Sequence, residues 1–409
     1  MKKLVIFLSL LSLLSCKVVD DYKKDLCSDS NSDCYEKAFD TSSIVPDDIE
    51  SSDAVNSAVI AKAQTYINDS YDASSDKHDS YGFIFGKEGS TFMHQGDGLM
   101  WNSVPLAAMC MMDSSSDYTF TTEIASLWNA IKTEMIMSDG RPRRHPLKDG
   151  ANGTSISRDM VTGYLYMGAM AKYTNCSGVT SDYLTYLEKV RDYAINNNWE
   201  LQNPAYLEKA NSTTTKMGDN TKRMMVSVLK IYGGDYSSIV LDNPDINAMT
   251  AEMKLADWIA EKKFYCRQGF IGSCLKGANL GVFGAHLTFL HAVTANIEYK
   301  LLGSSTYFSE FDLDTLLYDA ARIGNSVNHQ NWLMVAAYRH FTGGTFNDVY
   351  KALDEIFPDV IPGEIEGTNS TTRGCTDFIW QRIGWEYCSG SSEVYTGNDF
   401  LQAFAWSKI

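Results

Sequence analysis

Acidic side chains stand at the start of several apolar helical segments in this 409-residue sequence. Asp97 and Asp159 come just before or at the start of two such segments, and Asp219 opens a third. A pair of carboxyl groups on either side of a glycosidic bond can protonate the leaving oxygen and attack or activate water. We therefore interpret Asp97 and Asp159 as a candidate acid–base pair, with Asp219 as a substitute for either.

Side chains suited to binding a sugar accompany these carboxylates. Arg144 and Arg158 can hold a uronate or another acidic sugar by forked hydrogen bonds. Aromatic rings can stack on the faces of sugar rings. The other candidates for substrate binding also lie before or at the start of helical segments, and they are His94, Trp101, His145, His329, Trp332 and Tyr395.

The same acids also have a structural explanation. Asp97, Asp159 and Asp219 can each cap a helix, because a short polar side chain accepts the free N–H groups of the first turn. Arg158 beside Asp159 can form a structural ion pair. Capping does not account for the nearby Arg144-His145-Pro146 loop. We therefore keep both interpretations, helix caps and a sugar-binding site.

A lyase would use the same residues differently. Abstraction of a proton next to a uronate needs a base, and His145 or His329 could serve. The developing enolate needs a cation, and Arg144 or Arg158 could supply it. We rank the lyase below the hydrolase because no Tyr–His pair stands out by position.

The elements that must position these residues are helical. Apolar residues recur at three- and four-residue spacing along almost the whole chain, while long alternating strand patterns are scarce. The periodic segments form six pairs and lie near 53–68, 98–113, 121–137, 158–174, 181–198, 219–232, 247–263, 279–302, 313–325, 330–342, 347–357 and 398–408.

Two kinds of helix alternate along the chain. Segments such as Leu99–Met112 and Met160–Ala171 are apolar on nearly every face, whereas Tyr183–Ile195 and Phe346–Ile356 carry charged outer stripes. We therefore predict an all-α fold, an α/α toroid of about six helical hairpins, with an irregular helical bundle as the alternative. In a toroid all inner helices run the same way, so the residues that precede them share one cavity.

Three short strings resemble motifs of bacterial six-hairpin glycosidase-like proteins: Gly96-Asp97-Gly98-Leu99, Arg144-His145-Pro146 and Ser157-Arg158-Asp159-Met160. These are α/α-toroid proteins related in architecture to unsaturated glucuronyl hydrolases and some polysaccharide lyases. Met160 stands where the related Ser-Arg-Asp string continues with Gln, which weakens the transfer of a specific activity. The motifs cover residues 94–160, and the hairpin pattern covers about 53–409.

The N-terminus is typical of an exported lipoprotein. Met1–Lys3 is basic, Leu4–Leu14 is apolar, and Leu13-Leu14-Ser15-Cys16 resembles a bacterial lipobox, which implies that Cys16 is lipidated. An ordinary secretory signal is the alternative. We expect a signal peptide over 1–15, a lipidated Cys and flexible tether over 16–52, and the toroid domain over 53–409. Lys17 after the Cys favours the outer membrane of the cell envelope.

Eight cysteines remain once Cys16 carries lipid, and an even number in an exported chain favours disulfides. Closeness in the sequence pairs six of them with one another and leaves Cys110–Cys176 as a longer link. No zinc spacing with histidines is present. The three short-range pairs are Cys27–Cys34, Cys266–Cys274 and Cys375–Cys388.

The charge balance limits the classes of binding partner. With 35 Lys and Arg against 51 Asp and Glu, the formal net charge is −16, which argues against nucleic acid and against charge attraction to anionic membranes. Nucleophile-elbow, phosphate-loop, dinucleotide and zinc-helix motifs are absent, so we expect neither a cofactor nor a metal.

Together these features predict a membrane-anchored carbohydrate-active lipoprotein, a glycoside hydrolase acting on an acidic polysaccharide or oligosaccharide. A polysaccharide lyase is one alternative. A non-catalytic lipoprotein that binds a glycan or a protein in the same cavity is the other.

Overall fold

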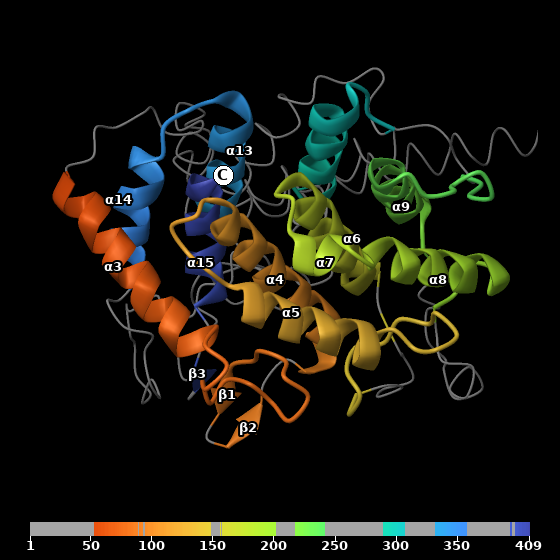
Figure 1. The fold of residues 1–409 in the computed structure, drawn as a ribbon, viewed down its shortest axis with the longest axis horizontal. Coiled ribbons are helices and arrows are strands. Elements are labelled where there is room, and N and C mark those ends of the chain that lie inside the picture. Colours follow the sequence, from red (N-terminus) through yellow and green to blue (C-terminus); the bar gives the residue numbers. More distant parts are fainter. Residues whose placement is uncertain are drawn as a thin grey trace, which may run out of the picture.

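The computed structural model describes residues 53–88, 90–92, 95–148, 156, 158–201, 217–241, 289–306, 332–357, 393–394 and 397–409. Helices predominate in these residues and strands are very short, which confirms the all-α class (Figure 1). The longer helices are α3 (Asp53–Ser70), α4 (Gly98–Ser114), α5 (Thr121–Ala130), α6 (Arg158–Tyr173), α8 (Tyr183–Asn196), α9 (Asp219–Tyr232), α13 (Trp332–Thr342), α14 (Asn347–Ile356) and α15 (Asn398–Ala405). Residues 289–302 are also helical.

Short elements connect these helices. They are the 3-10 turns η2 (Gln95–Asp97) and η7 (Trp406–Lys408), the π-helical turn η3 (Ile131–Met135) and the four-residue α7 (Ser177–Thr180). The strands β1 (Lys87–Glu88), β2 (Thr91–Phe92) and β3 (Glu393–Val394) form an antiparallel sheet in the order β2-β1-β3. This sheet ties the segment before α4 to the segment before α15.

The helix boundaries agree closely with the hydrophobic periodicity. Helix α9 has the predicted bounds, and α3, α4 and α6 differ from theirs by at most two residues at either end. The predicted helices at 247–263 and 313–325 lie outside the described residues, as do residues 1–52 with Cys16. Periodicity predicted one helix over 121–137, which the structure divides into α5 and the π-helical turn η3. It did not reveal α7 or the two-residue strands, because such short elements repeat no pattern.

Helices α4 and α6 lie side by side and parallel. A Cβ at Gly163 of α6 would lie 2.0 Å from the sulfur and 3.3 Å from the Cα of Met100, so a larger residue would displace the Met100 side chain and push the backbones apart near the start of both helices. Near the other end, Cys110 of α4 forms a disulfide with Cys176, three residues after α6 ends. Because early residues meet early ones and late residues meet late ones, the two helices run the same way.

Further helices extend this pair. Helix α9 packs on α6, where the Tyr232 hydroxyl donates to the Gly168 carbonyl at 2.9 Å. Helix α15 packs on α4, and the Gln402 amide donates to the Val104 carbonyl. Helix α13 packs on α15, so α9, α6, α4, α15 and α13 form one continuous row.

The helical stretch 289–302 is joined to α9 through Glu298. The buried Glu298 carboxylate accepts a hydrogen bond from Ser227 Oγ at 2.7 Å and from the Thr306 backbone N–H at 2.8 Å, and it lies 3.8 Å from Lys230 Nζ. A buried charge needs such partners. This acid therefore fixes the position of 289–302 against α9.

A second set of helices packs against the helices of this row. Helix α5 packs on α4, α8 packs on α9, and α14 packs on α13 and α15. Helix α3 lies beside α14 at one edge of the molecule (Figure 1). Lys62 of α3 is buried and donates to the carbonyls of Asp354 and Phe357, the residue that follows α14. This lysine fastens α3 to the C-terminal end of α14.

The C-terminal ends of α6 and α13 meet. Tyr173 Oη lies 3.0 Å from His340 Nε2, and the ring centroids of Tyr173 and Phe341 are 6.0 Å apart. Trp406, which follows α15, packs against both His340 and Phe341. The late residues of α6, α13 and α15 are therefore gathered at one end of the molecule.

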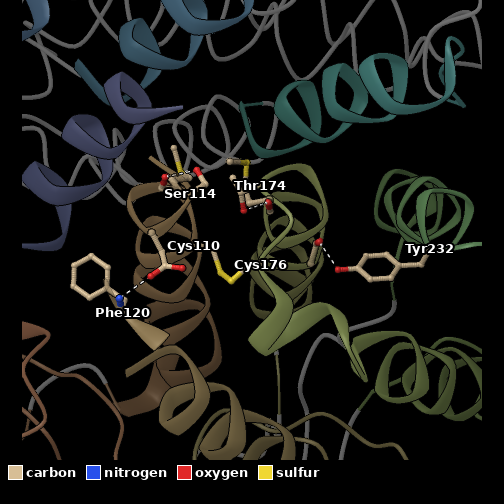
Figure 2. The surroundings of a disulfide bond; sticks show 10 residues. Cys110, Ser114, Phe120, Thr174, Cys176 and Tyr232 are labelled. Carbon is tan, nitrogen blue, oxygen red and sulfur yellow. Dashed lines mark hydrogen bonds between the residues drawn. A yellow bond between two sulfur atoms is a disulfide. The ribbon is translucent and has the colours of Figure 1, made fainter. Parts of the chain in front are cut away.

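The disulfide between Cys110 and Cys176 confirms the predicted long link (Figure 2). Both residues are buried, and the bond joins positions 66 residues apart. Figure 2 shows Cys110 on α4 and Cys176 beside α6, with the α9 residue Tyr232 reaching α6 from its other side. The other predicted cysteine pairs lie outside the described residues.

We predict that a Cys110→Ser/Cys176→Ser variant loses about 4 kcal/mol of unfolding free energy, because the disulfide restricts a long loop in the unfolded chain. Urea unfolding of the variant and of the wild type measures this loss. Ser114→Ala is the control, since the Ser114 hydroxyl donates only to Met111 in its own helix. Equal urea midpoints for the double variant and the control would contradict the prediction.

We also predict that the protein loses stability as the pH falls below about 6.5. Burial lowers the pKa of His340, and the positive charge of Lys300 lowers it further, although a hydrogen bond with Ile409 opposes this. A lowered pKa means that the unfolded chain binds the proton more readily, so the stabilising effect is present above pH 6.5 and fades below it. Thermal unfolding between pH 7.5 and 5.5 should show a smaller decline for His340→Gln than for the wild type.

Candidate functional site

An ion pair stands where α4 begins. Arg144 Nη1 lies 2.9 Å from Asp97 Oδ1 and 2.7 Å from the Gly96 carbonyl oxygen. Asp97 is the N-cap residue of α4, yet its side chain makes no capping hydrogen bond. The Asp97 and Arg144 side chains are 30% and 18% exposed, so both can be reached from solvent. The Asp97 side chain therefore pairs with Arg144 and does not cap α4.

The loop that carries Arg144 is fastened at its start. The Met137 N–H donates to the Arg141 carbonyl and the Arg143 N–H donates to the Met135 carbonyl, each at 2.9 Å. The Arg143 guanidinium also donates to the Glu134 carbonyl. These bonds form a narrow hairpin that leads from η3 into the loop.

His145, the next residue after Arg144, lies inside the core. Its side chain is 0% exposed and its Nε2 lies 2.8 Å from Asp79 Oδ2, whose side chain is 3% exposed. Nδ1 accepts a hydrogen bond from the Leu147 N–H at 3.2 Å, so the proton of the neutral ring lies on Nε2 and is donated to Asp79. The adjacent Arg144 and His145 thus have different surroundings, one partly exposed and one buried.

Aromatic residues enclose the His145 ring. The ring centroids of Tyr81, Phe83 and Phe85 lie 5.4, 5.5 and 5.6 Å from that of His145, all in edge-to-face arrangements. Asp79, at the start of this aromatic segment, also accepts the N–H groups of Tyr81 and Phe83 on Oδ1. Asp79 is not among the residues predicted from the sequence, because no pattern there pairs it with a histidine 66 residues away.

The other predicted site residues fall into three groups. Trp101 and Trp332 are half-buried and pack against the core. Arg158, Asp159 and Asp219 lie in the first turns of α6 and α9, and the structure describes only their backbone. The remaining three candidates, His94, His329 and Tyr395, lie outside the described residues. Of the predicted residues, the structure brings Asp97 and Arg144 into contact.

Two further polar groups lie on α6 and α15, two helices of the row. Tyr164 of α6 packs toward α5 and α8, against Trp128 and Tyr183. Tyr166, two residues on, therefore lies on the opposite face of α6. Its hydroxyl, like the amide oxygen of Gln402 on α15, is buried without a hydrogen-bond partner in the part of the chain that the structure describes.

The described ranges contain no cluster of His, Cys, Asp and Glu side chains that could hold a metal ion. None of the helices in these ranges is long and apolar enough to cross a membrane. Comparison with protein-family models, curated proteins and solved structures finds no match to this chain.

We predict that Gly98→Ala lowers the free energy of unfolding by about 1–3 kcal/mol. A Cβ at Gly98 would lie 2.5 Å from the Arg144 carbonyl oxygen, so the loop beside α4 would have to move. Gly96→Ala is the matched control, since a Cβ there meets nothing within 4 Å. Urea unfolding of the two variants measures the difference, and equal stabilities would show that the loop does not rest on α4 at Gly98.

Proposed function

We propose that this chain is a carbohydrate-active lipoprotein of the bacterial cell envelope, a glycoside hydrolase that cleaves an acidic polysaccharide or oligosaccharide. The observation that carries the proposal is the Asp97 carboxylate, which is partly exposed and bonded to Arg144 in place of capping α4. A carboxylate held by a cation at a reachable helix start can take part in acid–base chemistry.

The helix contacts support a toroid as the framework of this site. The row α9, α6, α4, α15 and α13 has the order that an inner ring requires, and Glu298 adds 289–302 next to α9. The positive charge of Lys300 of that stretch lowers the pKa of His340 on α13, so the two side chains lie within electrostatic range of each other, as the closing of a ring would require. Helices α3, α5, α8 and α14 then belong to the outer ring.

The common direction of these helices supports a shared site at one end of the molecule. Late residues of α6, α13 and α15 gather around Tyr173, His340 and Trp406. Because α4 and α6 are parallel, their starts lie together at the opposite end. The sheet that links the segments before α4 and α15 supports the same direction for α15.

Asp97 and Asp159 are suited to act as a pair. Gly163 lies against Met100, so position 159, one turn before Gly163, is level with the residues one turn before Met100, where Asp97 lies. Neighbouring helix axes are about 8–10 Å apart, which suits the roughly 5–9.5 Å between the carboxyl groups of glycosidases. A guanidinium 2.9 Å away favours the ionised form of Asp97. We therefore assign Asp97 as the base or nucleophile and Asp159 as the acid, with Asp219 in reserve.

Arg144 supports the choice of an acidic substrate. Nη1 of its guanidinium is engaged by Asp97 and Gly96, and the side chain is 18% exposed, so another part of the guanidinium faces solvent. A sugar carboxylate is a fitting partner for that exposed part, because guanidinium and carboxylate groups form forked, charge-assisted hydrogen bonds. Arg158 is assigned to the same group of substrate ligands, and Trp101 and Trp332 to stacking on sugar rings.

The hydrolase is favoured over the lyase by the surroundings of His145. A proton-abstracting base must reach the substrate, and the His145 ring is fully buried with both nitrogens engaged, by Asp79 and by Leu147.

The disulfide agrees with export, since such bonds persist in oxidising compartments. Lipidation of Cys16 would then hold the chain at a membrane.

We predict that Asp97→Asn and Asp159→Asn each reduce the release of reducing ends by about 10²- to 10⁴-fold, because each removes an acid–base group. The assay uses the full-length chain in detergent with a panel of acidic polysaccharides and peptidoglycan, and it follows absorbance near 235 nm in parallel. Asp113→Asn is the control, since Asp113 lies near the other end of α4 and its oxygen only accepts the Phe120 N–H.

Each outcome of this assay has one meaning. Reducing ends without absorbance support the hydrolase, and both signals together mean a lyase. Binding of a polysaccharide without either signal, unchanged in both Asp variants, would replace the enzyme by a glycan-binding lipoprotein. Equal losses in Asp97→Asn and Asp113→Asn would show that Asp97 matters only for folding.

A further inference from the structure

We propose that Asp79 is a positioning residue, which acts through His145 to hold Arg144 against Asp97. The inference deepens the proposed function and rests on it, because Asp97 is the carboxylate that we assign to the reaction. Asp79 itself touches neither Asp97 nor Arg144 in the contacts described above. Its influence would pass through one buried hydrogen bond and one peptide unit.

The first step is that Asp79 has a single orientation. Its Oδ1 accepts the backbone N–H groups of Tyr81 at 2.9 Å and Phe83 at 3.0 Å. Its Oδ2 lies 2.8 Å from His145 Nε2, and the side chain is 3% exposed. A carboxylate that accepts bonds on both oxygens in a buried setting cannot rotate without leaving a donor unsatisfied.

The second step is that Asp79 selects the state of His145. Because Nδ1 accepts the Leu147 N–H, the neutral ring must donate from Nε2, and Asp79 is the acceptor at that position. Without the carboxylate, Nε2–H would be buried with no acceptor. The other tautomer would place a second donor opposite the Leu147 N–H. Either result pushes the ring out of its aromatic enclosure.

The third step is that Arg144 follows His145. The Arg144 carbonyl rests on Gly98, where there is no room for even a Cβ, so the loop has one position on α4. The Arg144 guanidinium then reaches Asp97 and Gly96 from this fixed backbone. A shift of His145 therefore changes the contact between Arg144 and Asp97, although neither of these two residues is itself substituted.

The experiment compares Asp79→Asn with Asp348→Asn. Asp348 is a matched control because it is also buried, accepts the Arg339 guanidinium at 2.7 Å, and lies on α14. We expect both variants to lower the Tm, while Asp79→Asn alone lowers kcat, by about 10- to 100-fold, on the polysaccharide that the wild type cleaves fastest. Equal kcat values for the two variants would overturn the proposal.

Two substitutions of His145 test the hydrogen bond apart from the shape of the ring. His145→Gln can still present an N–H donor to Asp79, whereas His145→Phe fills the aromatic enclosure without a donor. We expect His145→Gln to keep most of the wild-type kcat and His145→Phe to lose as much as Asp79→Asn. A similar kcat for the two His145 variants would mean that packing alone matters.

A double-mutant cycle tests the route through Arg144. If Asp79 acts through Arg144, Asp79→Asn should cause no further loss of kcat in an Arg144→Ala background, whereas an independent role would give the same fold-loss in both backgrounds. The Tm values of the same four proteins provide a readout that needs no substrate. If the wild type cleaves nothing on the panel, the proposed function fails. Non-additive Tm shifts would then still support the coupling between Asp79 and Arg144, whereas additive Tm shifts would overturn it.

Discussion

The close, parallel contact between α4 and α6 is the constraint on which the rest of the described structure depends. Helix α4 is buried on almost every side from Gly98 to Met112, with only Trp101 partly exposed, so each of its faces needs an apolar neighbour. Gly163 lets α6 approach one face, and α5 and α15 cover others. A helix covered in this way can carry polar chemistry only at its ends.

The two ends of this pair are used differently. At the late end the buried disulfide and the half-buried Tyr173–His340 contact join neighbouring elements. At the early end Asp97 and Arg144 remain partly exposed. The chain thus fixes its helices at one end and leaves charged groups accessible at the other. This division is what a helical framework with a ligand site requires, since groups that bind a substrate cannot also be fully satisfied by the fold.

Sequence reasoning succeeded where one pattern repeats over many residues. The bounds of α9 and α6 follow from apolar residues at helical spacing, and Cys110–Cys176 follows from assigning the nearer cysteines to one another. It could not distinguish the surroundings of Arg144 from those of His145. Neighbouring residues in a loop have no periodicity that assigns one to solvent and the other to the core. That assignment depends on Asp79 and on three aromatic rings that are distant in the sequence.

The Asp97–Arg144 pair is held by a loop whose anchor, His145, lies among core aromatic residues. Phe85 contacts His145 and also lies where a Cβ of Gly98 would meet it, so the same ring supports the loop and the start of α4. A change in the packing of Phe85 would therefore reach both members of the ion pair at once. The geometry of the candidate site is in this sense a property of the aromatic core beneath it, and the charged residues alone do not determine it.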